Sequence, residues 1–264
     1  DLHLSIRRQR QMCIRDRFKR LTGEDRLLII GIPILVVLTV GGWLIWHATA
    51  ELDDIEERTL QISSVLTMTR EHLVLVVISA LLVIATAVPL GIVLTRKSTK
   101  FMAPIITSIA NIGQAAPVVG VIVLLAIWLG FGEPVAILGL WFYAFLPVLA
   151  NVIAGLRGVD KQLVEAAYGL SMSPIQVLTK VELPMALPVI MTGIRTSLVL
   201  LVGAGAFATF IDAGGLGGLI TTGITLYRNP ILISGAVLIA ALALAVEWVG
   251  RVLEVVFAPK GMIK

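Results

Sequence analysis

The 264-residue sequence has few charged side chains, few aromatic ones and almost no cysteine. Only 14% of its residues are charged, against about 25% in a soluble domain, which excludes an ordinary globular enzyme; the apolar content excludes disorder. The single cysteine, Cys13, cannot form an internal disulfide, and the three histidines are too widely spaced to suggest a metal cluster. What is abundant is apolar side chains, at 58% of the total, which points to a polytopic membrane protein if they occur in long runs.

Such runs are present. A spanning helix needs about 20 mostly apolar residues, and six segments that are nearly free of Asp, Glu, Lys and Arg meet that length. Strict alternation of polar and apolar residues is absent, which argues against a transmembrane barrel. The third segment is long and contains Pro104 and Pro117, so it predicts a kinked helix or an interfacial turn before the true span. The sequence thus predicts an all-α polytopic membrane protein with six transmembrane helices, at residues 27–50, 73–95, 101–132, 134–156, 183–211 and 231–250.

Basic residues gather on one side of the predicted membrane. If the N-terminus is cytoplasmic, 17 of the 21 Lys and Arg residues lie in inner segments, Arg195 lies within a span, and only Arg58, Arg70 and Arg228 lie outside. The positive-inside rule therefore predicts that both termini are cytoplasmic. Because the basic residues flank a span, we interpret them as a topology signal and expect no nucleic-acid partner.

The two ends of the chain are predicted to be short tails. Residues 1–26 form a basic cytoplasmic tail, and residues 259–264 form the C-terminal one. Residues 8–17 read RQRQMCIRDR and resemble a translated sequencing adapter, which raises the alternative that roughly the first 17 residues are not native. The first span, 27–50, is too long and too internal for a simple cleaved signal peptide, although an uncleaved anchor looks the same. Whether this span belongs to a transport pathway stays open.

The longest inner connection, residues 157–184, is predicted to form two short helices. Asp160 is a plausible N-cap for the first, and Ser173 with Gln176 forms a capping box for the second, with Pro174 at its first position. Pro184 marks the return to the membrane. The result is a compact cytoplasmic knob able to move as a rigid body. Its apolar side chains are expected on one face of each helix, at Leu163, Ala167 and Leu170, then at Ile175, Leu178 and Val181.

This connection resembles the EAA loop of ABC importer permeases. The family pattern is Glu-Ala-Ala, three residues, Gly, nine residues, Ile, any residue, Leu-Pro. Here Ser171 replaces the glycine, which puts the turn geometry in doubt because serine tolerates fewer backbone angles; Gly169 nearby is a candidate to relieve it. The candidate residues of this loop for coupling to an ATPase, which the resemblance implies, are Glu165, Ala166, Ala167, Gly169, Ser171, Leu183 and Pro184.

Three further segments are similar to permeases for glycine betaine, carnitine, choline and related osmoprotectants. They are residues 111–117 (NIGQAAP), 181–201 and 213–217 (AGGLG), and the likeness covers residues 60–258. The resemblance implies a type I ABC importer permease core in a bacterial or archaeal cytoplasmic membrane. It also implies a second permease subunit, identical or not, two cytoplasmic ATPase subunits that hold ATP and Mg²⁺, and an extracytoplasmic substrate-binding protein. No cofactor is expected in this chain itself.

Several polar residues in or near the spans are candidates for the transport pathway. An unpaired charge in lipid costs about 2.5–3.5 kcal/mol on insertion scales, so Arg195 should face protein or water. It either lines the pathway or forms a structural ion pair, for which Glu247 is a conceivable partner. Asn111, Gln114 and Pro117 could form a polar, kinked pathway segment, or serve helix packing equally well.

A glycine-rich stretch follows the fifth span on the predicted outer side. It lacks the Lys-Ser/Thr of a P-loop and has no strand before it, so nucleotide binding is not expected. Its glycines instead suit a re-entrant or interfacial turn that packs closely on other helices. Asp212 either contacts the binding protein or caps a helix. The candidate contact residues for a binding protein are Asp212, Gly214, Gly215 and Gly217.

The sequence therefore predicts the transmembrane permease subunit of an ATP-driven importer of compatible solutes. It has no Walker A pattern, so ATP hydrolysis is expected in a separate subunit and the chain is not expected to be an enzyme. Two alternatives remain: an ABC permease for another small solute, such as an amino acid or a sulfonate, and an ion-coupled secondary transporter. The second is disfavoured because inverted repeats and mid-span carboxylates are not evident.

Overall fold

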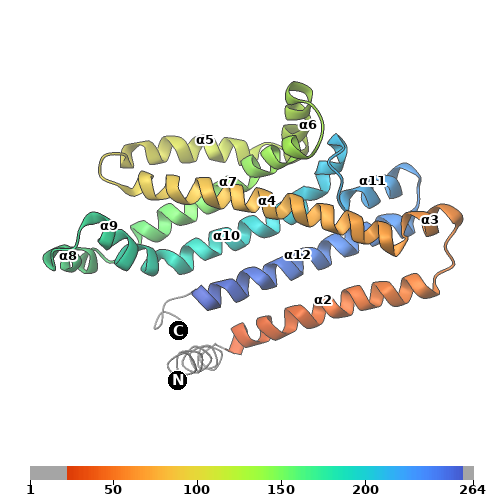
Figure 1. Ribbon diagram of the computed structural model, residues 1–264, viewed down its shortest axis with the longest axis horizontal. Helices are drawn as coiled ribbons and strands as arrows, with labels where there is room; N and C mark the ends of the chain where they lie inside the picture. The colour runs from red at the N-terminus through yellow and green to blue at the C-terminus, as the bar shows by residue number, and fades with distance from the viewer. Residues whose placement is uncertain (1–22, 258–264) are drawn as a thin grey trace, which may run out of the picture.

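The computed structural model describes residues 23–257, and within that range every regular element is helical. Most of the two predicted tails, including Cys13 and residues 1–17, therefore lies outside the described residues. The long helices lie along one axis, side by side (Figure 1). The elements are α2 (Gly23–Thr49), α3 (Asp54–Thr59), α4 (Ile62–Thr95), η1 (Lys100–Met102), α5 (Ala103–Ala115), α6 (Val118–Leu129), α7 (Glu133–Arg157), α8 (Lys161–Gly169), α9 (Pro174–Val177), η2 (Leu178–Glu182), α10 (Leu183–Gly205), η3 (Ala206–Ile211), α11 (Gly217–Thr225) and α12 (Asn229–Phe257).

Five described helices are long and apolar enough to cross a membrane, and a sixth crossing results if the bent pair α5–α6 counts as one. The prediction of an all-α membrane protein with about six spans is thus confirmed. The helix that contains the second predicted span, residues 73–95, begins earlier, at Ile62. Its 34 residues correspond to about 51 Å at helical rise, well beyond the hydrocarbon thickness. The charge-free window did not include its first turns because they carry Arg70 and Glu71.

The third predicted span is two helices that meet at 95°. Pro117 causes the break: it biases the residue before it away from helical angles, and Ala116 takes an extended conformation with φ −68° and ψ 142°. Pro104, which was expected to interrupt a helix, instead lies in the first turn of α5, where its missing N–H costs nothing. Of the two predicted alternatives, the structure therefore has the kink, as a sharp corner in the middle of the segment.

The buried core lies where α7 packs between α4 and α10. Close approach of α7 and α10 depends on Gly193, because a Cβ there would lie 2.5 Å from Cβ of Asn151 and 2.8 Å from the Pro147 carbonyl oxygen. Small residues at helix crossings are the usual means of packing in lipid, where the hydrophobic effect does not drive helices together. The three helices therefore form one tightly packed unit that positions the loops at both ends.

Helix α2 packs on α12 at the edge of the molecule. Two tryptophan N–H groups attach it: Nε1 of Trp43 donates to Oγ of Ser234 at 2.9 Å, and Nε1 of Trp248 donates to the Ile29 carbonyl at 2.9 Å. Most of its other apolar side chains are exposed, such as Leu27 at 72%. Such a surface fits lipid, so Leu27–Thr49 is a candidate span, as predicted for residues 27–50.

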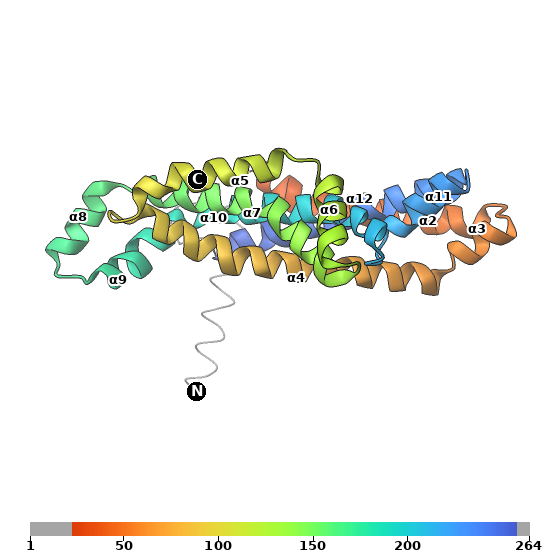
Figure 2. The same ribbon diagram turned by 90° about the horizontal axis from the view of Figure 1, so that it is seen from above.

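The two predicted functional regions lie at opposite ends of the long axis. Helices α8 and α9 project beyond the helix bundle at one end, and α3 and α11 lie at the other (Figures 1 and 2). Any functional link between these ends has to pass along the long helices.

Candidate functional site

The projecting loop begins with α8, and the predicted N-cap is present. Oδ1 of Asp160 accepts a hydrogen bond from the backbone N–H of Gln162 at 2.9 Å. Within α8, Glu165 and Ala166 are exposed, whereas Ala167 is buried at 4% and holds the helix against the rest of the loop. The Glu-Ala-Ala triplet thus exposes its acidic residue and buries its last alanine.

The turn after α8 is built on Ser171, which takes the left-handed conformation with φ 61°. Its N–H donates to the Tyr168 carbonyl at 2.9 Å, and the N–H of Met172 donates to the Ala167 carbonyl at 3.2 Å. Gly169 was expected to relieve the missing glycine, and this expectation is wrong: Gly169 is the last residue of α8 and does not take a positive φ. The closing turn falls two residues later, so serine itself bears the strain.

The second half of the loop begins with the predicted capping box. The N–H of Ser173 donates to Oε1 of Gln176 at 2.9 Å, and the N–H of Gln176 donates to Oγ of Ser173 at 3.4 Å. Helix α9 is short and widens into a π-helical turn, η2, that leads directly into α10. Pro184, predicted to mark the return to the membrane, lies in the first turn of α10. The helical run from Pro174 to Ile211 is continuous through it.

The expected apolar face of the second helix is only partly present. Leu178 and Val181 are half-buried, whereas Ile175 is 73% exposed and Val177 is fully buried in its place. With Leu163, Tyr168 and Leu170, at 45%, 47% and 75% exposure, Ile175 belongs to a set of large apolar side chains exposed on the projecting loop. Exposed apolar side chains grouped on one projection are typical of a protein contact surface.

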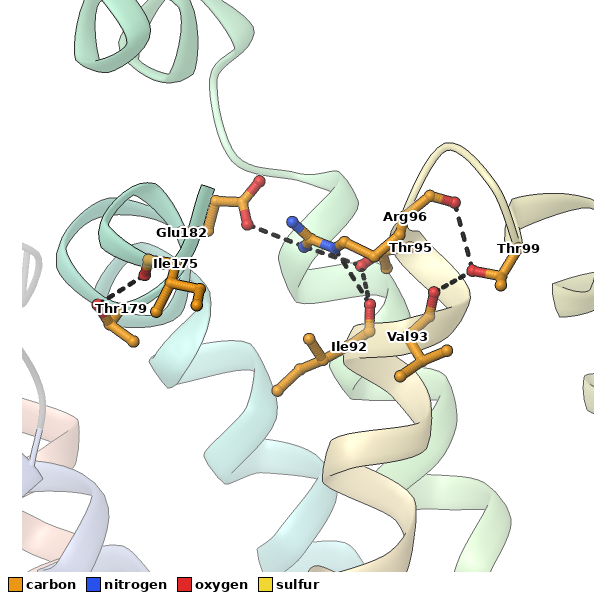
Figure 3. A network of polar contacts seen from close by, with 8 residues as sticks. All are labelled: Ile92, Val93, Thr95, Arg96, Thr99, Ile175, Thr179 and Glu182. Carbon is orange, nitrogen blue, oxygen red and sulfur yellow. Dashed lines mark hydrogen bonds and ion pairs between the residues drawn. The ribbon is translucent and has the colours of Figure 1, made fainter. Parts of the chain in front are cut away.

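An ion pair that the sequence did not reveal closes the loop. Nη2 of Arg96, at the end of α4, lies 2.8 Å from Oε2 of Glu182, the last residue of η2 (Figure 3). The two residues are far apart in sequence, Arg96 lies outside any motif, and Glu182 occupies the position of the loop pattern that accepts any residue, so pattern reading had no signal for the pair. A basic residue at a span end is a topology signal first, and its partner becomes evident only in three dimensions.

The polar residues predicted for the pathway are distributed over two separate places. Asn111 and Gln114 lie on the last turns of α5, and Pro117 caps α6 across the 95° corner. Asn111 and Pro117 are exposed and Gln114 is half-buried, so their polar groups are available to a partner or to solvent. The structure brings these three together but keeps Arg195 apart, on α10.

Arg195 forms the structural ion pair that the sequence suggested, and one more. Its Nε lies 3.4 Å from Oε1 of Glu247, and its Nη1 donates to Oε2 of Glu254 at 2.7 Å. Arg251 adds a second cation, 3.6 Å from Glu247. Two positive and two negative charges thus neutralise one another between α10 and α12, which explains how an arginine is tolerated within a span.

The glycine-rich turn packs on the outer end of α4. Gly214 and Gly215 have positive φ angles of 76° and 90°, and the N–H of Gly215 donates to Oε2 of Glu71 at 3.0 Å. Beneath them His72 is fully buried, and its Nε2 donates to the Val202 carbonyl at 2.9 Å. Glu71 and His72 escaped sequence reasoning because they precede the charge-free part of α4.

The remaining residues of this turn explain its shape. Gly217 begins α11, where a Cβ would lie 1.9 Å from the Ala206 carbonyl oxygen, so only glycine fits. Asp212 is exposed and adopts the left-handed conformation with φ 58° at the end of η3. No side-chain cap by Asp212 is observed among the described residues, so of the two predicted roles an external contact remains the one to test.

Comparison with known proteins agrees with this architecture. Residues 87–255 match the family described as binding-protein-dependent transport system inner membrane component. The chain is 43% identical over 194 residues to the choline transport system permease protein OpuBB of Bacillus subtilis (strain 168), covering 74% of this chain and 88% of that one. It is 35% identical over 230 residues to the osmoprotectant import permease protein OsmY of Salmonella typhimurium, covering 86% and 94%.

Among solved structures, the fold is similar to a chain of the inward-facing MetNI methionine ABC transporter, with a TM-score of 0.67 and 23% identity, covering 79% of this chain and 100% of that one. This likeness concerns the fold alone. Family match, sequence relatives and fold agree with the resemblance carried by Glu165 and its neighbours. The chain therefore belongs to the family of inner-membrane components of binding-protein-dependent transport systems, and it is a permease, a transport subunit and not an enzyme.

Proposed function

We propose that this permease serves an ATP-driven importer of compatible solutes in the class of glycine betaine, choline and carnitine. The observation that carries the proposal is the agreement between an exposed Glu-Ala-Ala loop and relatives named as choline and osmoprotectant permeases. The matches cover nearly the full length of these two relatives, so the likeness is not limited to one shared segment.

The projecting loop is proposed to dock on a cytoplasmic ATPase subunit. Glu165 and Ala166 face outward, next to the exposed apolar side chains Tyr168 and Leu170. A leucine that is 75% exposed is unfavourable in water, and a partner groove would remove it from solvent. ATP and Mg²⁺ would be held by that partner, and closure of two ATPase subunits would move the loop.

The opposite end of the molecule is proposed to receive substrate from an extracytoplasmic binding protein. The exposed Asp212 and the turn containing Gly214, Gly215 and Gly217 are the contact candidates. The pathway itself would form with a second permease subunit, identical or not, and Asn111, Gln114 and Pro117 would line it. Arg195 remains a pathway candidate, although its two carboxylate contacts support a structural role.

The proposed setting is a bacterial or archaeal cytoplasmic membrane with both termini inside. The end that carries α8 is basic, with Lys97, Lys100, Arg157 and Lys161. The opposite end carries α3, whose first turn holds Asp54, Glu56 and Glu57. This distribution supports the orientation predicted by the positive-inside rule.

The test is solute uptake by the assembled importer. The permease is co-expressed with its neighbouring ATPase and binding protein in cells lacking other osmolyte uptake, and entry of labelled glycine betaine, choline and carnitine is measured. Glu165→Lys should abolish uptake while the protein remains inserted. Glu57→Lys, which reverses an exposed carboxylate on α3, is the matched control and should leave uptake unchanged.

Three outcomes would contradict the proposal. Uptake that continues without a functional ATPase would favour an ion-coupled transporter. Binding of amino acids or alkanesulfonates, but not of quaternary ammonium solutes, to the purified binding protein would transfer the importer to another substrate class. Normal uptake by the Glu165→Lys variant would remove the loop from the coupling mechanism.

A further inference from the structure

The corner between α4 and α5 is rigidly built around Arg96. The guanidinium Nε donates to the Ile92 carbonyl at 3.2 Å, and Nη2 donates to Oγ1 of Thr95 at 3.1 Å. The Arg96 carbonyl accepts from the N–H groups of Thr99 at 3.1 Å and Lys100 at 2.9 Å. The side chain is therefore held in one orientation by the end of its own helix (Figure 3).

Glu182 meets this arginine from the projecting loop. Its side chain is 13% exposed, and its Oε2 lies 2.8 Å from Nη2 of Arg96 but has no aligned hydrogen-bond donor in the described part of the chain. The charge of Arg96 is thus what compensates the carboxylate there. A buried charge without compensation is strongly unfavourable, so the two side chains depend on each other.

The chain path explains why such a contact matters. The loop continues into α10 through one helical run from Pro174 to Ile211, so movement of the loop reaches α10 through the backbone. Elements α8, α9 and η2 pack chiefly on one another and on α10. Helices α4 and α5 are linked to the loop through packing, because α7, which leads into α8, packs on both of them. The ion pair adds a direct polar contact between the loop and their corner.

We propose that Arg96 and Glu182 are positioning residues that transmit movement of the projecting loop to the α4–α5 corner, and hence to α5 with Asn111 and Gln114. The proposal rests on the proposed docking of that loop to an ATPase. If the pair holds the corner to the loop, α10 and α5 move together when the loop moves. If it is absent, only packing on α7 links the corner to the loop, so α5 follows α10 less closely and ATP is hydrolysed without a matching amount of transport.

Charge arithmetic separates this role from a merely structural one. Replacing one partner leaves the other charge uncompensated, which lowers stability. Replacing both, in Arg96→Gln with Glu182→Gln, removes both charges and leaves no unpaired one, so folding is expected to persist. The double variant therefore tests coupling in a folded subunit.

The experiment uses the complete importer in proteoliposomes, with ATPase and binding protein, and measures solute taken up per ATP hydrolysed. We expect this ratio to fall about 2-fold to 30-fold in the double Gln variant, the range that a lost coupling contact of 0.5–2 kcal/mol produces. The charge-conserving variant Arg96→Lys, which keeps a cation opposite Glu182, should retain most of the ratio. Lys97→Gln, which neutralises the exposed neighbouring cation, is the control and should match the unmodified importer.

The result that overturns the proposal is a double Gln variant with an unchanged ratio of uptake to hydrolysis. An Arg96→Lys variant that assembles but is as uncoupled as the double Gln variant would also overturn it. A structural defect alone would reduce the amount of assembled importer and leave the ratio unchanged. Failure of the proposed function is distinct, because then the unmodified importer would show no ATP-dependent uptake at all.

Discussion

Arg195 on α10 places its Nη1 2.7 Å from Oε2 of Glu254 on α12, beyond Glu247, which was the partner suggested by the sequence. The contact joins two candidate spans whose backbones also approach closely, because Gly250 lies against the aliphatic part of the arginine. Glu247 is in turn shared between Arg195 and Arg251. Removal of Arg195 and removal of one carboxylate should therefore lower the stability of the subunit by different amounts.

Arg195→Met is expected to destabilise the subunit by about 3 kcal/mol, because it leaves Glu254 partly buried without its cation. Glu254→Gln should cost less, since Glu247 remains to balance Arg195. Thermal unfolding of the purified protein in detergent gives the comparison. Arg157→Met, at an exposed arginine that ends α7, is the control and should change stability by less than about 0.5 kcal/mol. Equal stability of the Arg195 and Arg157 variants would contradict the structural role.

The glycine turn offers a second comparison, with a glycine of α10 as its control. Gly217→Ala should prevent correct packing of α11, because its Cβ would meet the Ala206 carbonyl oxygen at 1.9 Å and neither backbone can yield easily. Gly203→Ala is the matched control: nothing lies within 4 Å of the added carbon, and alanine favours the helix by about 1 kcal/mol. Yield of monodisperse protein and its melting temperature are the measurements. A Gly217→Ala variant with the same melting temperature as the Gly203→Ala variant would show that the turn is not closely packed.

Much of this fold follows from local signals in the sequence. Runs of apolar residues locate the spans, and Asp160 and Ser173 locate two helix starts, because a span and a cap each depend on residues within one turn or one run. Glu254, Glu71, His72 and Glu182 could not be assigned roles in the same way. Each acts through a partner that lies many residues away, and its own neighbourhood resembles any helix end.

Backbone geometry at turns was also only partly predictable. Pro117 indicated a break but not that α5 and α6 would meet at 95°, because the angle is set by how both helices pack on α7. The absence of glycine at position 171 indicated an unusual turn. It did not reveal that Ser171 itself would take φ 61° while Gly169 stays helical.

Ser171→Gly should therefore strengthen the projecting loop. The left-handed conformation costs a non-glycine residue about 1–2 kcal/mol. Glycine removes this cost, but its greater freedom in the unfolded chain offsets part of the gain. The expected local stabilisation is therefore about 0.5–1 kcal/mol. Ser173→Ala should act in the opposite direction by about 1 kcal/mol, because it removes the cap of α9. Hydrogen exchange of the loop peptides reports both: exchange at Met172 slows in the first variant, and exchange at Gln176 quickens in the second. Faster exchange at Met172 in the glycine variant would contradict the strain argument.

The orientation of the chain can be tested by cysteine labelling. After Cys13→Ser, single cysteines are introduced by Lys97→Cys near the projecting loop and by Tyr227→Cys at the opposite end, where Tyr227 is 93% exposed. A membrane-impermeant maleimide added to intact spheroplasts should label the second variant only, because the positive-inside rule places the basic end in the cytoplasm. Detergent permeabilisation should then allow both to react, which controls for accessibility. Labelling of the Lys97→Cys variant in intact spheroplasts would reverse the orientation, and with it the assignment of the projecting loop to the side on which ATP is available.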